Sequence, residues 1–416
     1  KFDLFVLKNI GIINDTCQLA GIPYPRTHEI DWNDQRVWAD MMRSPVGIFQ
    51  MEGAFAFKLL KDFGTKSIFD MSLVTACIRP SGASYRNDLI AHKPHHNPSP
   101  MIDELLKDNN GYLIYQEDVI KFLQQICGLS GSEADNVRRA IARKKEDLLQ
   151  KLLPRILDGY CSKSDKPRAE AEQEAMEFIQ ILKDASSYMF GYNHSIAYCL
   201  VGYICAWLRC YYPGEFITTY LNHAKNDDDI TGGTDLAKEY GIPIESPRFE
   251  LSKSVYAYDK EHNVISKGLS SLKGYGEAVC DDLYAVGSTY PQRFTDALRL
   301  LNERSIKAAK VAPLIKIDYF ATYGNTVELA RILNVFDFFK QGTAKKISKD
   351  KVAGSPVEDL LKKYATDRNA KGEEMKSYTI TDMDGLLHEA EDTILAMKLP
   401  DVSLRIKIQN QLEILG

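Results

Sequence analysis

Apolar residues recur at helical spacing along most of the chain and predict a mainly α fold. Between residues 31 and 70 the pattern predicts two short helices, one bracketed by Trp32 and Trp38 and one running from Phe49 through Leu60. Further helices are predicted over residues 118–127, 134–148, 168–187 and 195–212, with a helical pair in 311–333 and a last helix at the C-terminus.

Four parts of the chain depart from this helical pattern. Residues 1–15 are apolar and β-branched and predict a short strand, while residues 255–258 and 263–266 flank a polar tip as the strands of a hairpin do. An acidic, Gly-rich stretch at 226–233 indicates a domain boundary. Residues 340–376 are rich in Lys and Gly with little apolar periodicity, so we expect a mobile linker there.

The most apolar run, residues 195–212, contains a single charged residue, Arg209, and is long enough to suggest a membrane span. It is also rich in Tyr and Cys, and Pro213-Gly214 ends it as soluble helices are commonly ended. We therefore expect a buried core helix and no membrane partner.

The composition describes an ordinary globular protein of two or three domains, with 416 residues, 44% of them hydrophobic and 26% charged. The formal net charge of -5 excludes general attraction to nucleic acid, so any polyanion must bind at a local basic patch. The chain opens on Lys1, so we expect a processed protein or a fragment.

Cysteine and histidine spacing gives no sign of a metal centre. The eight Cys residues form no C-x-x-C pair and lie mostly in apolar runs, which is typical of reduced thiols in a cytoplasmic protein. The spacing of His92, His95 and His96 matches no standard ligand set. We therefore predict neither a zinc site nor disulfides.

One stretch concentrates positive charge, with five cationic side chains in residues 138–145. If residues 134–148 form one helix, Val137, Ile141 and Leu148 share a buried face while Arg139 and Arg143 point away from it. Such a face is either simply solvated or a phosphate site, since the Arg fork binds two oxygens in fixed geometry. The stretch alone does not decide between these interpretations.

A second candidate for phosphate binding is the Gly274-Tyr275-Gly276 turn that follows Lys273. A Gly-x-Gly turn that opens a helix is the signature of a helix–hairpin–helix motif, whose exposed N–H groups can hold a phosphate. The helical pair in 311–333 resembles a degenerate second copy.

Several blocks fit one family in one order, and the chain resembles the bacterial-type (C-family) DNA polymerase III alpha subunits. The blocks are Lys1-Phe2-Asp3, residues 48–52, Arg79-Pro80, Tyr115-Gln116-Glu117, Ala134-Asp135 with Arg138-Arg139-Ala140 and Lys144-Lys145, Tyr188-Met189-Phe190 with His194 and Tyr198, Tyr212-Pro213, residues 268–277 and residues 411–416. Two positions depart from the family pattern, Ser81 where a Gly is usual and Tyr192 where a Lys is expected. These departures suggest a divergent, phage-type member.

The resemblance implies a domain order. Residues 1–15 correspond to the C-terminal edge of the palm, 16–225 to a multi-helical fingers domain and 226–339 to a tandem helix–hairpin–helix domain with a small β-hairpin. Residues 340–416 correspond to a linker and helices leading to an OB domain outside the chain. The palm block with paired aspartates is expected before Lys1, so we expect the segment to be inactive alone.

The resemblance also implies a function, the template-directed transfer of a nucleotide from dNTP to a primer 3'-OH by a two-metal mechanism with Mg²⁺. Asp3 would be the catalytic and metal-binding carboxylate of this chain. The expected nucleotide-binding residues are Arg79, Tyr115, Gln116, Arg138, Arg139, Arg143, Lys144, Lys145, His194 and Tyr198, and the expected DNA-binding residues are Lys273, Gly274, Tyr275 and Gly276.

The implied partners are primer–template DNA, dNTP, the rest of the polymerase chain and a sliding clamp. Two other functions compete with a polymerase: a non-enzymatic helical DNA-binding module with helix–hairpin–helix phosphate grips, and a scaffold whose basic helix meets an acidic protein.

Overall fold

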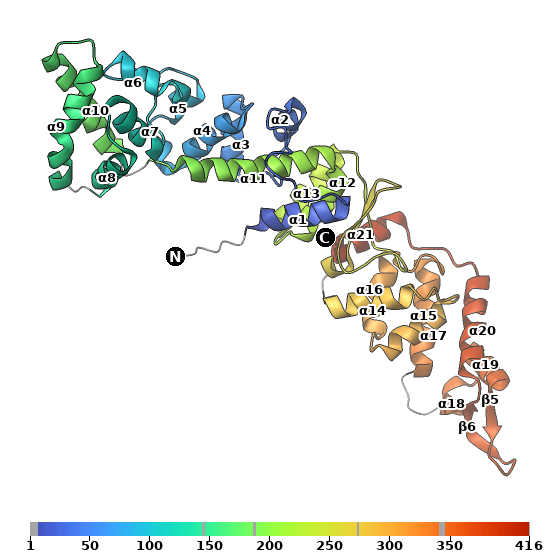
Figure 1. Ribbon diagram of the computed structural model, residues 1–416. Helices are drawn as coiled ribbons and strands as arrows, with labels where there is room; N and C mark the ends of the chain where they lie inside the picture. The colour runs from blue at the N-terminus through green and yellow to red at the C-terminus, as the bar shows by residue number, and fades with distance from the viewer. Residues whose placement is uncertain (1–6, 144–145, 186–188, 273, 341–345, 416) are drawn as a thin grey trace. The chain divides into compact units, whose positions relative to one another are not determined.

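The computed structural model describes residues 7–143, 146–185, 189–272, 274–340 and 346–415, which are mainly helical with two small sheets (Figure 1). The predicted mainly α fold is confirmed. The chain divides into two compact units, residues 1–236 and 237–416, and each is described by itself. Within the described ranges, no helix combines the length and apolar character that crossing a membrane requires.

Unit 1 is organised around the long helix α11 (Tyr192–Tyr211), which is the apolar run of the sequence. Its inner face buries Cys199, Tyr203, Cys205 and Leu208 against the surrounding helices, as expected for a core helix. Pro213 then occupies the first turn of α12, where its missing N–H costs no hydrogen bond. The helices around α11 are α1 (Lys8–Ala20), α2 (Gln35–Met41), α3 (Ala54–Phe63), α4 (Ile68–Ile78) and α12 (Pro213–Asn222).

The charge of Arg209 is accommodated inside this core, where its side chain is 0% exposed. Nε donates to Oδ2 of Asp40 at 2.8 Å, and Nη2 donates to the Asp40 carbonyl at 2.8 Å. Nη1 donates to the carbonyls of Ser44 and Val46 at 2.8 and 2.7 Å. A buried guanidinium is tolerable only when it is paired in this way, and the pairing fixes α11 to α2.

A second core in unit 1 surrounds Phe122, Phe178 and Tyr160. It is built from α6 (Pro100–Leu105), α7 (Gln116–Lys121), the π-helical turn Phe122–Ile126, α8 (Gly131–Ala142), α9 (Glu146–Lys163) and α10 (Arg168–Ala185). The remaining elements of unit 1 are the 3-10 turns Pro80–Gly82 and Lys107–Asn109 and the helix α5 (Arg86–Ile90), and α13 (Asp227–Glu239) runs across the division between the units.

Unit 2 begins with a three-stranded sheet in which β3 (Val264–Ser266) pairs parallel with β1 (Ile244–Glu245) and antiparallel with β2 (Ala257–Asp259). The predicted hairpin is confirmed by the pair β2 and β3. A helical core follows, built from the 3-10 turn Leu269–Ser271, α14 (Glu277–Gly287), α15 (Phe294–Glu303), α16 (Ala308–Lys316) and α17 (Thr326–Lys340).

The predicted linker is wrong over its described part. Residues 346–380 contain an antiparallel sheet in which β6 (Glu374–Ile380) lies between β4 (Lys346–Ser348) and β5 (Ala365–Arg368). Val352, Leu361 and Tyr378 are buried in the core of unit 2, so the segment has enough apolar surface to fold. The helices of this part are α18 (Lys349–Val352), α19 (Pro356–Tyr364), α20 (Met383–Ala396) and α21 (Leu404–Leu415).

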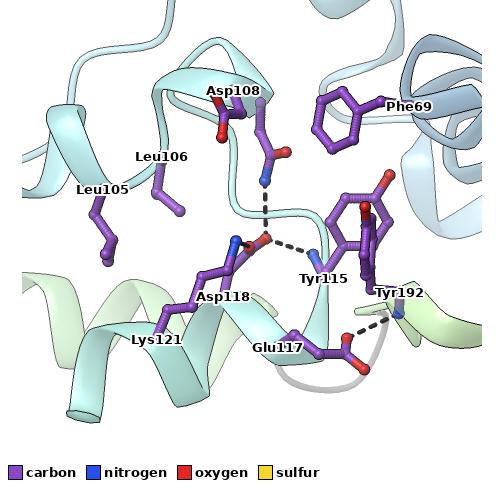
Figure 2. A pocket seen from close by; sticks show the side chains of 10 residues that line it. Phe69, Leu105, Leu106, Asp108, Tyr115, Glu117, Asp118, Lys121 and Tyr192 are labelled. Carbon is purple, nitrogen blue, oxygen red and sulfur yellow. Dashed lines mark hydrogen bonds and ion pairs between the residues drawn. The ribbon is translucent and has the colours of Figure 1, made fainter. Parts of the chain in front are cut away.

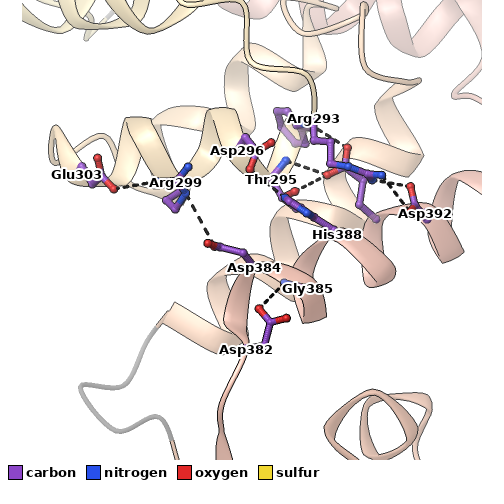
Figure 3. Close-up of polar contacts among 12 residues, drawn as sticks. Arg293, Thr295, Asp296, Arg299, Glu303, Asp382, Asp384, Gly385, His388 and Asp392 are labelled. Carbon is purple, nitrogen blue, oxygen red and sulfur yellow. Dashed lines mark hydrogen bonds and ion pairs between the residues drawn. The ribbon is translucent and has the colours of Figure 1, made fainter. Parts of the chain in front are cut away.

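Helix α20 fastens this segment to the helical core (Figure 3). The buried carboxylate of Glu391 accepts from the backbone N–H groups of Phe294 and Thr295, both at 2.9 Å, and from the Thr295 hydroxyl. These are N–H groups of the first turn of α15, which have no partner inside that helix. A side chain of α20 therefore caps α15 from outside.

Three further predictions about element bounds need correction. Residues 8–15 belong to helix α1, so a palm strand at the N-terminus could involve only residues outside the described ranges. The basic helix α8 ends at Ala142, so residue 148 belongs to the next helix, α9, and the predicted single helix over 134–148 is wrong. The acidic stretch 226–233 is largely helical, within α13, and the division between the units falls at residues 236 and 237.

Candidate nucleotide-binding site

Helix α8 presents two arginines from a firmly capped helix. Ser130 and Glu133 form a capping box at its start, and Val137 and Ile141 lie in the core. With one face fixed in this way, Arg138 and Arg139 are carried on the other side of the helix.

Asp135 holds both arginines. Its Oδ1 accepts from Nε and Nη2 of Arg138 at 3.0 and 2.8 Å, and its Oδ2 lies 2.7 Å from Nη2 of Arg139. The Arg138 hydrogen bonds, followed by the nearby Arg139 charge, lower the pKa of the Asp135 carboxyl. The group is therefore ionised near neutral pH, and the three side chains together carry one net positive charge.

Gln116 connects this cluster to the segment before α11. Its Oε1 accepts from Nη1 of Arg138 at 2.9 Å, while its backbone N–H donates to the carbonyl of Phe190 at 2.9 Å. Its Nε2 donates to the carbonyl of Met189 at 3.3 Å. Two predicted nucleotide-binding residues, Gln116 and Arg138, are thus in direct contact.

An aromatic row continues from Phe190 along the N-terminal turns of α11. The guanidinium of Arg79 lies 3.7 Å from the centre of the Phe190 ring. The centre of the His194 ring lies 5.6 Å from the centre of the same Phe190 ring. His194 and Tyr198 are one helical turn apart, with ring centres 4.1 Å apart, and Tyr198 also contacts Phe49. The predicted residues Arg79, His194 and Tyr198 therefore form one connected surface.

The predicted contact between Tyr115 and nucleotide needs correction in this structure. The Tyr115 residue is 2% exposed, its hydroxyl lies 2.7 Å from Oγ of Ser72, and burial raises its pKa. Tyr115 is the N-cap of α7, directly before Gln116, and at this position its side chain lies in the core. Tyr115 is therefore placed to position Gln116, and the little surface it exposes lies in the wall of a neighbouring pocket.

The other predicted residues are placed only in part. Arg143 is exposed at the C-terminal cap of α8. Asp3, Lys144, Lys145 and Lys273 lie outside the described residues.

A pocket of about 440 Å³ lies beside this site, on the other face of α7 (Figure 2). Asp118 stands in its wall and accepts from Asn109 and the backbone N–H groups of residues 114 and 115; burial raises the pKa of Asp118 to about 6. Tyr192 also lines the pocket, with its ring 5.0 Å from that of Tyr115. One of the two positions that depart from the family pattern, Tyr192, thus faces this pocket.

In unit 2 the Gly-x-Gly turn leads directly into helix α14. Gly274 has a φ of 88°, which favours glycine, and Gly276 is the N-cap of α14. The element before the turn is the single 3-10 turn Leu269–Ser271, so the first helix of the predicted motif is shortened. The sequence missed Lys310 on α16, whose Nζ donates to the Gly274 carbonyl and lies over the Tyr275 ring.

The described residues do not fit a metal ion, because no three His, Cys, Asp or Glu side chains among them are grouped as ligands. In the histidine-rich loop, Nε2 of His92 lies 2.8 Å from the carbonyl of Phe63, and the His95 ring stacks on Tyr112. His96 lies beside Asp103.

Residues 9–164 match the family described as the bacterial DNA polymerase III alpha subunit finger domain. This range contains Arg79, Gln116 and the Asp135 cluster. Over this range the chain is similar to the finger domain of bacterial DNA polymerase III alpha subunits. Relatives with that name include proteins of Ureaplasma parvum, 25% identical over 80% of this chain, Aquifex aeolicus, 29% identical over 70%, and Borreliella burgdorferi, 28% identical over 77%.

The chain spans only part of these DNA polymerase III alpha subunits, namely 35%, 25% and 28% of their respective lengths.

Asp135 is the residue of the site that sequence reasoning left without a role. Its signal was present, since an acid four residues before Arg139 is the favoured arrangement for an ion pair on a helix.

Proposed function

We propose that unit 1 binds the incoming nucleotide in a replicative DNA-directed DNA polymerase, as its fingers domain. The observation that carries this proposal is the continuous connection from Arg139 through Asp135, Arg138 and Gln116 to the aromatic row at the start of α11. It joins groups suited to a triphosphate with rings suited to a base, and the fingers-domain match over residues 9–164 supports the same role.

The chemistry of the two ends is complementary. Arg139 is held by one carboxylate oxygen and is largely exposed, so it offsets the charge of the β and γ phosphates. Tyr198 presents a flat ring that stacks on any base, which suits an enzyme that copies all four template letters. Arg79 adds a cation above Phe190 at the near end of the row.

Unit 2 would hold the duplex by its backbone. Gly274, Tyr275 and Gly276 form the turn, and Lys310 brings a positive charge to it from α16. Contacts of this kind bind phosphate without reading sequence and weaken as salt increases.

Nucleotidyl transfer in this family implies divalent metal ions, which neutralise charge on the phosphates. Since the described residues do not fit a metal, and Asp3 lies outside them, we assign no step of the reaction to a metal held by this chain. The partners that follow from the proposal are dNTP, primer–template DNA, the remaining polymerase domains and a sliding clamp.

The test is Arg139→Ala in a primer-extension assay with the complete polymerase. We expect kcat/KM for dNTP to fall by about 10-fold or more, because an arginine on a transferred phosphate can contribute ~10³-fold. The Kd for primer–template should change less than about twofold. The matched control is Arg168→Ala on α10, an exposed arginine paired with Asp158 and Glu172. Equal losses in nucleotide and DNA binding would make α8 a DNA contact and contradict the proposal.

A further inference from the structure

We infer that Asp135 occupies the place of a phosphate on Arg139 and makes the site selective for highly charged ligands. This role deepens the proposed function and rests on it. Asp135 is then a specificity-determining residue that releases Arg139 only to a ligand able to replace its carboxylate.

The two arginines are held very unequally. Arg138 uses Nε, Nη1 and Nη2 in hydrogen bonds to Asp135 and Gln116, and its side chain is 18% exposed. Arg139 contacts Asp135 through Nη2, and its side chain is 58% exposed. Arg138 is therefore fixed as part of the framework, whereas Arg139 can exchange its partner at low cost.

The carboxylate presents the two arginines with what a phosphate would present. One oxygen serves Arg138 and the other serves Arg139, as two oxygens of one phosphate group can. Because the Arg139 guanidinium is already paired with Asp135, it gains little binding energy from a ligand that carries one negative charge. A triphosphate brings several charges together and replaces the carboxylate with a net gain.

This arrangement separates the incoming nucleotide from the much more abundant DNA backbone. Each backbone phosphate carries one charge, as Asp135 does, so exchange of Asp135 for a single backbone phosphate leaves the balance nearly unchanged. The net charge of one on the cluster also limits general attraction to polyanions.

Asp135→Asn separates the two arginines experimentally. The side-chain amide keeps one oxygen that can accept from Arg138, but replaces the oxygen facing Arg139 by an NH₂ group. Arg139 is released while the Arg138 framework and the bond to Gln116 are kept. Asp62→Asn is the matched control, because it removes the i,i+4 partner of Lys58 from α3; the Asp62 side chain is 42% exposed, against 31% for Asp135.

The probe is inorganic triphosphate, titrated at low salt into the chain and its variants, with orthophosphate titrated in parallel. We expect Asp135→Asn to tighten triphosphate binding by about two- to fivefold, the range that release of one exposed ion pair allows. Orthophosphate should gain at least as much, so the preference for triphosphate should not rise. Asp62→Asn should shift either affinity by less than about 1.5-fold.

Arg139→Ala and the double variant distinguish the possible failures. In the double variant the gain from Asp135→Asn should disappear, since Arg139 is the group that it releases. A gain that persists would be a general charge effect and would overturn the role of Asp135, as would weaker triphosphate binding in Asp135→Asn. If Arg139→Ala alone leaves triphosphate binding unchanged, the nucleotide-binding proposal itself fails.

Discussion

The buried pair between Arg209 and Asp40 allows a prediction whose size follows from the structure. Arg209→Met keeps the length and apolar stem of the side chain but removes every donor. The Asp40 carboxylate, on a side chain 6% exposed, then loses its buried partner, and the carbonyls of Ser44 and Val46 lose the donors they have from Arg209.

Removal of one partner from a buried ion pair costs about 3–5 kcal/mol. Asp40 keeps an ion pair with the exposed Arg43, whose Nη1 lies 4.0 Å from its Oδ1, so we expect the lower end of this range. With a urea dependence of about 3 kcal/mol per molar, this predicts an unfolding midpoint lower by at least ~1 M. Asp40→Asn combined with Arg209→Met should recover part of the loss, since the buried side chain at residue 40 then carries no charge.

Tryptophan fluorescence measures this in the whole chain, because all three tryptophans, Trp32, Trp38 and Trp207, belong to unit 1. The matched control is Arg36→Met on α2, whose side chain is 74% exposed and contacts Asp34 and the Tyr211 hydroxyl of α11 at the surface, and it should lower the midpoint much less. If Arg209→Met lowers the midpoint no more than Arg36→Met does, the buried pair does not hold α11 to α2 and the reasoning is refuted.

Three further predictions concern pH, capping and DNA. Burial raises the pKa of Asp118 from 3.8 to about 6, so its protonated form should stabilise unit 1 below pH ~4, and roughly 3 kcal/mol of stability should be lost as pH rises through 6. Asp118→Asn should flatten this pH dependence of the unfolding free energy, measured by tryptophan fluorescence. An unchanged slope would exclude Asp118 as its source. Glu391→Ala should lower the free energy of unfolding by about 2–3 kcal/mol and speed hydrogen exchange at Phe294 and Thr295. The control is Asp392→Ala, which removes the exposed partner of Arg293 and should cost under about 1 kcal/mol. Equal losses would count against capping by Glu391. Lys310→Ala should weaken duplex binding alike for all sequences and reduce the slope of log K against log salt by about 1, and an unchanged slope would remove Lys310 from the phosphate contacts.

The sequence predicted the elements that rest on strong periodicity. The apolar run of α11, the polar helix α10 and the hairpin of β2 and β3 were all found within a few residues. The extent of α8 was overestimated, because nothing in the letters of residues 138–145 indicates that the helix ends before Arg143.

The small sheet of unit 2 was missed for a physical reason. Strands β4 and β5 have only three and four residues, and the start of β6 exposes its charged residues Glu374 and Lys376. Alternation over such short strands is easily mistaken for a polar linker. Their apolar partners come from α18 and α19, which no local pattern reveals.

Long-range partners were equally inaccessible to sequence reasoning. Gln116 and Arg138 could be proposed separately for one site, but their direct hydrogen bond depends on how α7 and α8 pack. Asp40 and Arg209 lie 169 residues apart, so only the fold brings them together. The burial of Tyr115 beside an accessible Gln116 is a similar case.

Helix α11 also connects the buried pair at Arg209 to the aromatic row in its N-terminal turns. His194 precedes Arg209 by fifteen residues, which is about 22 Å along the helix axis. A tilt of about 5° around the Arg209 anchor would displace His194 by about 2 Å, and misplacement by ~1 Å can cost ~100-fold in rate. Substitutions around Asp40 would then displace His194 and Tyr198 by changing the angle of α11, without contacting either residue.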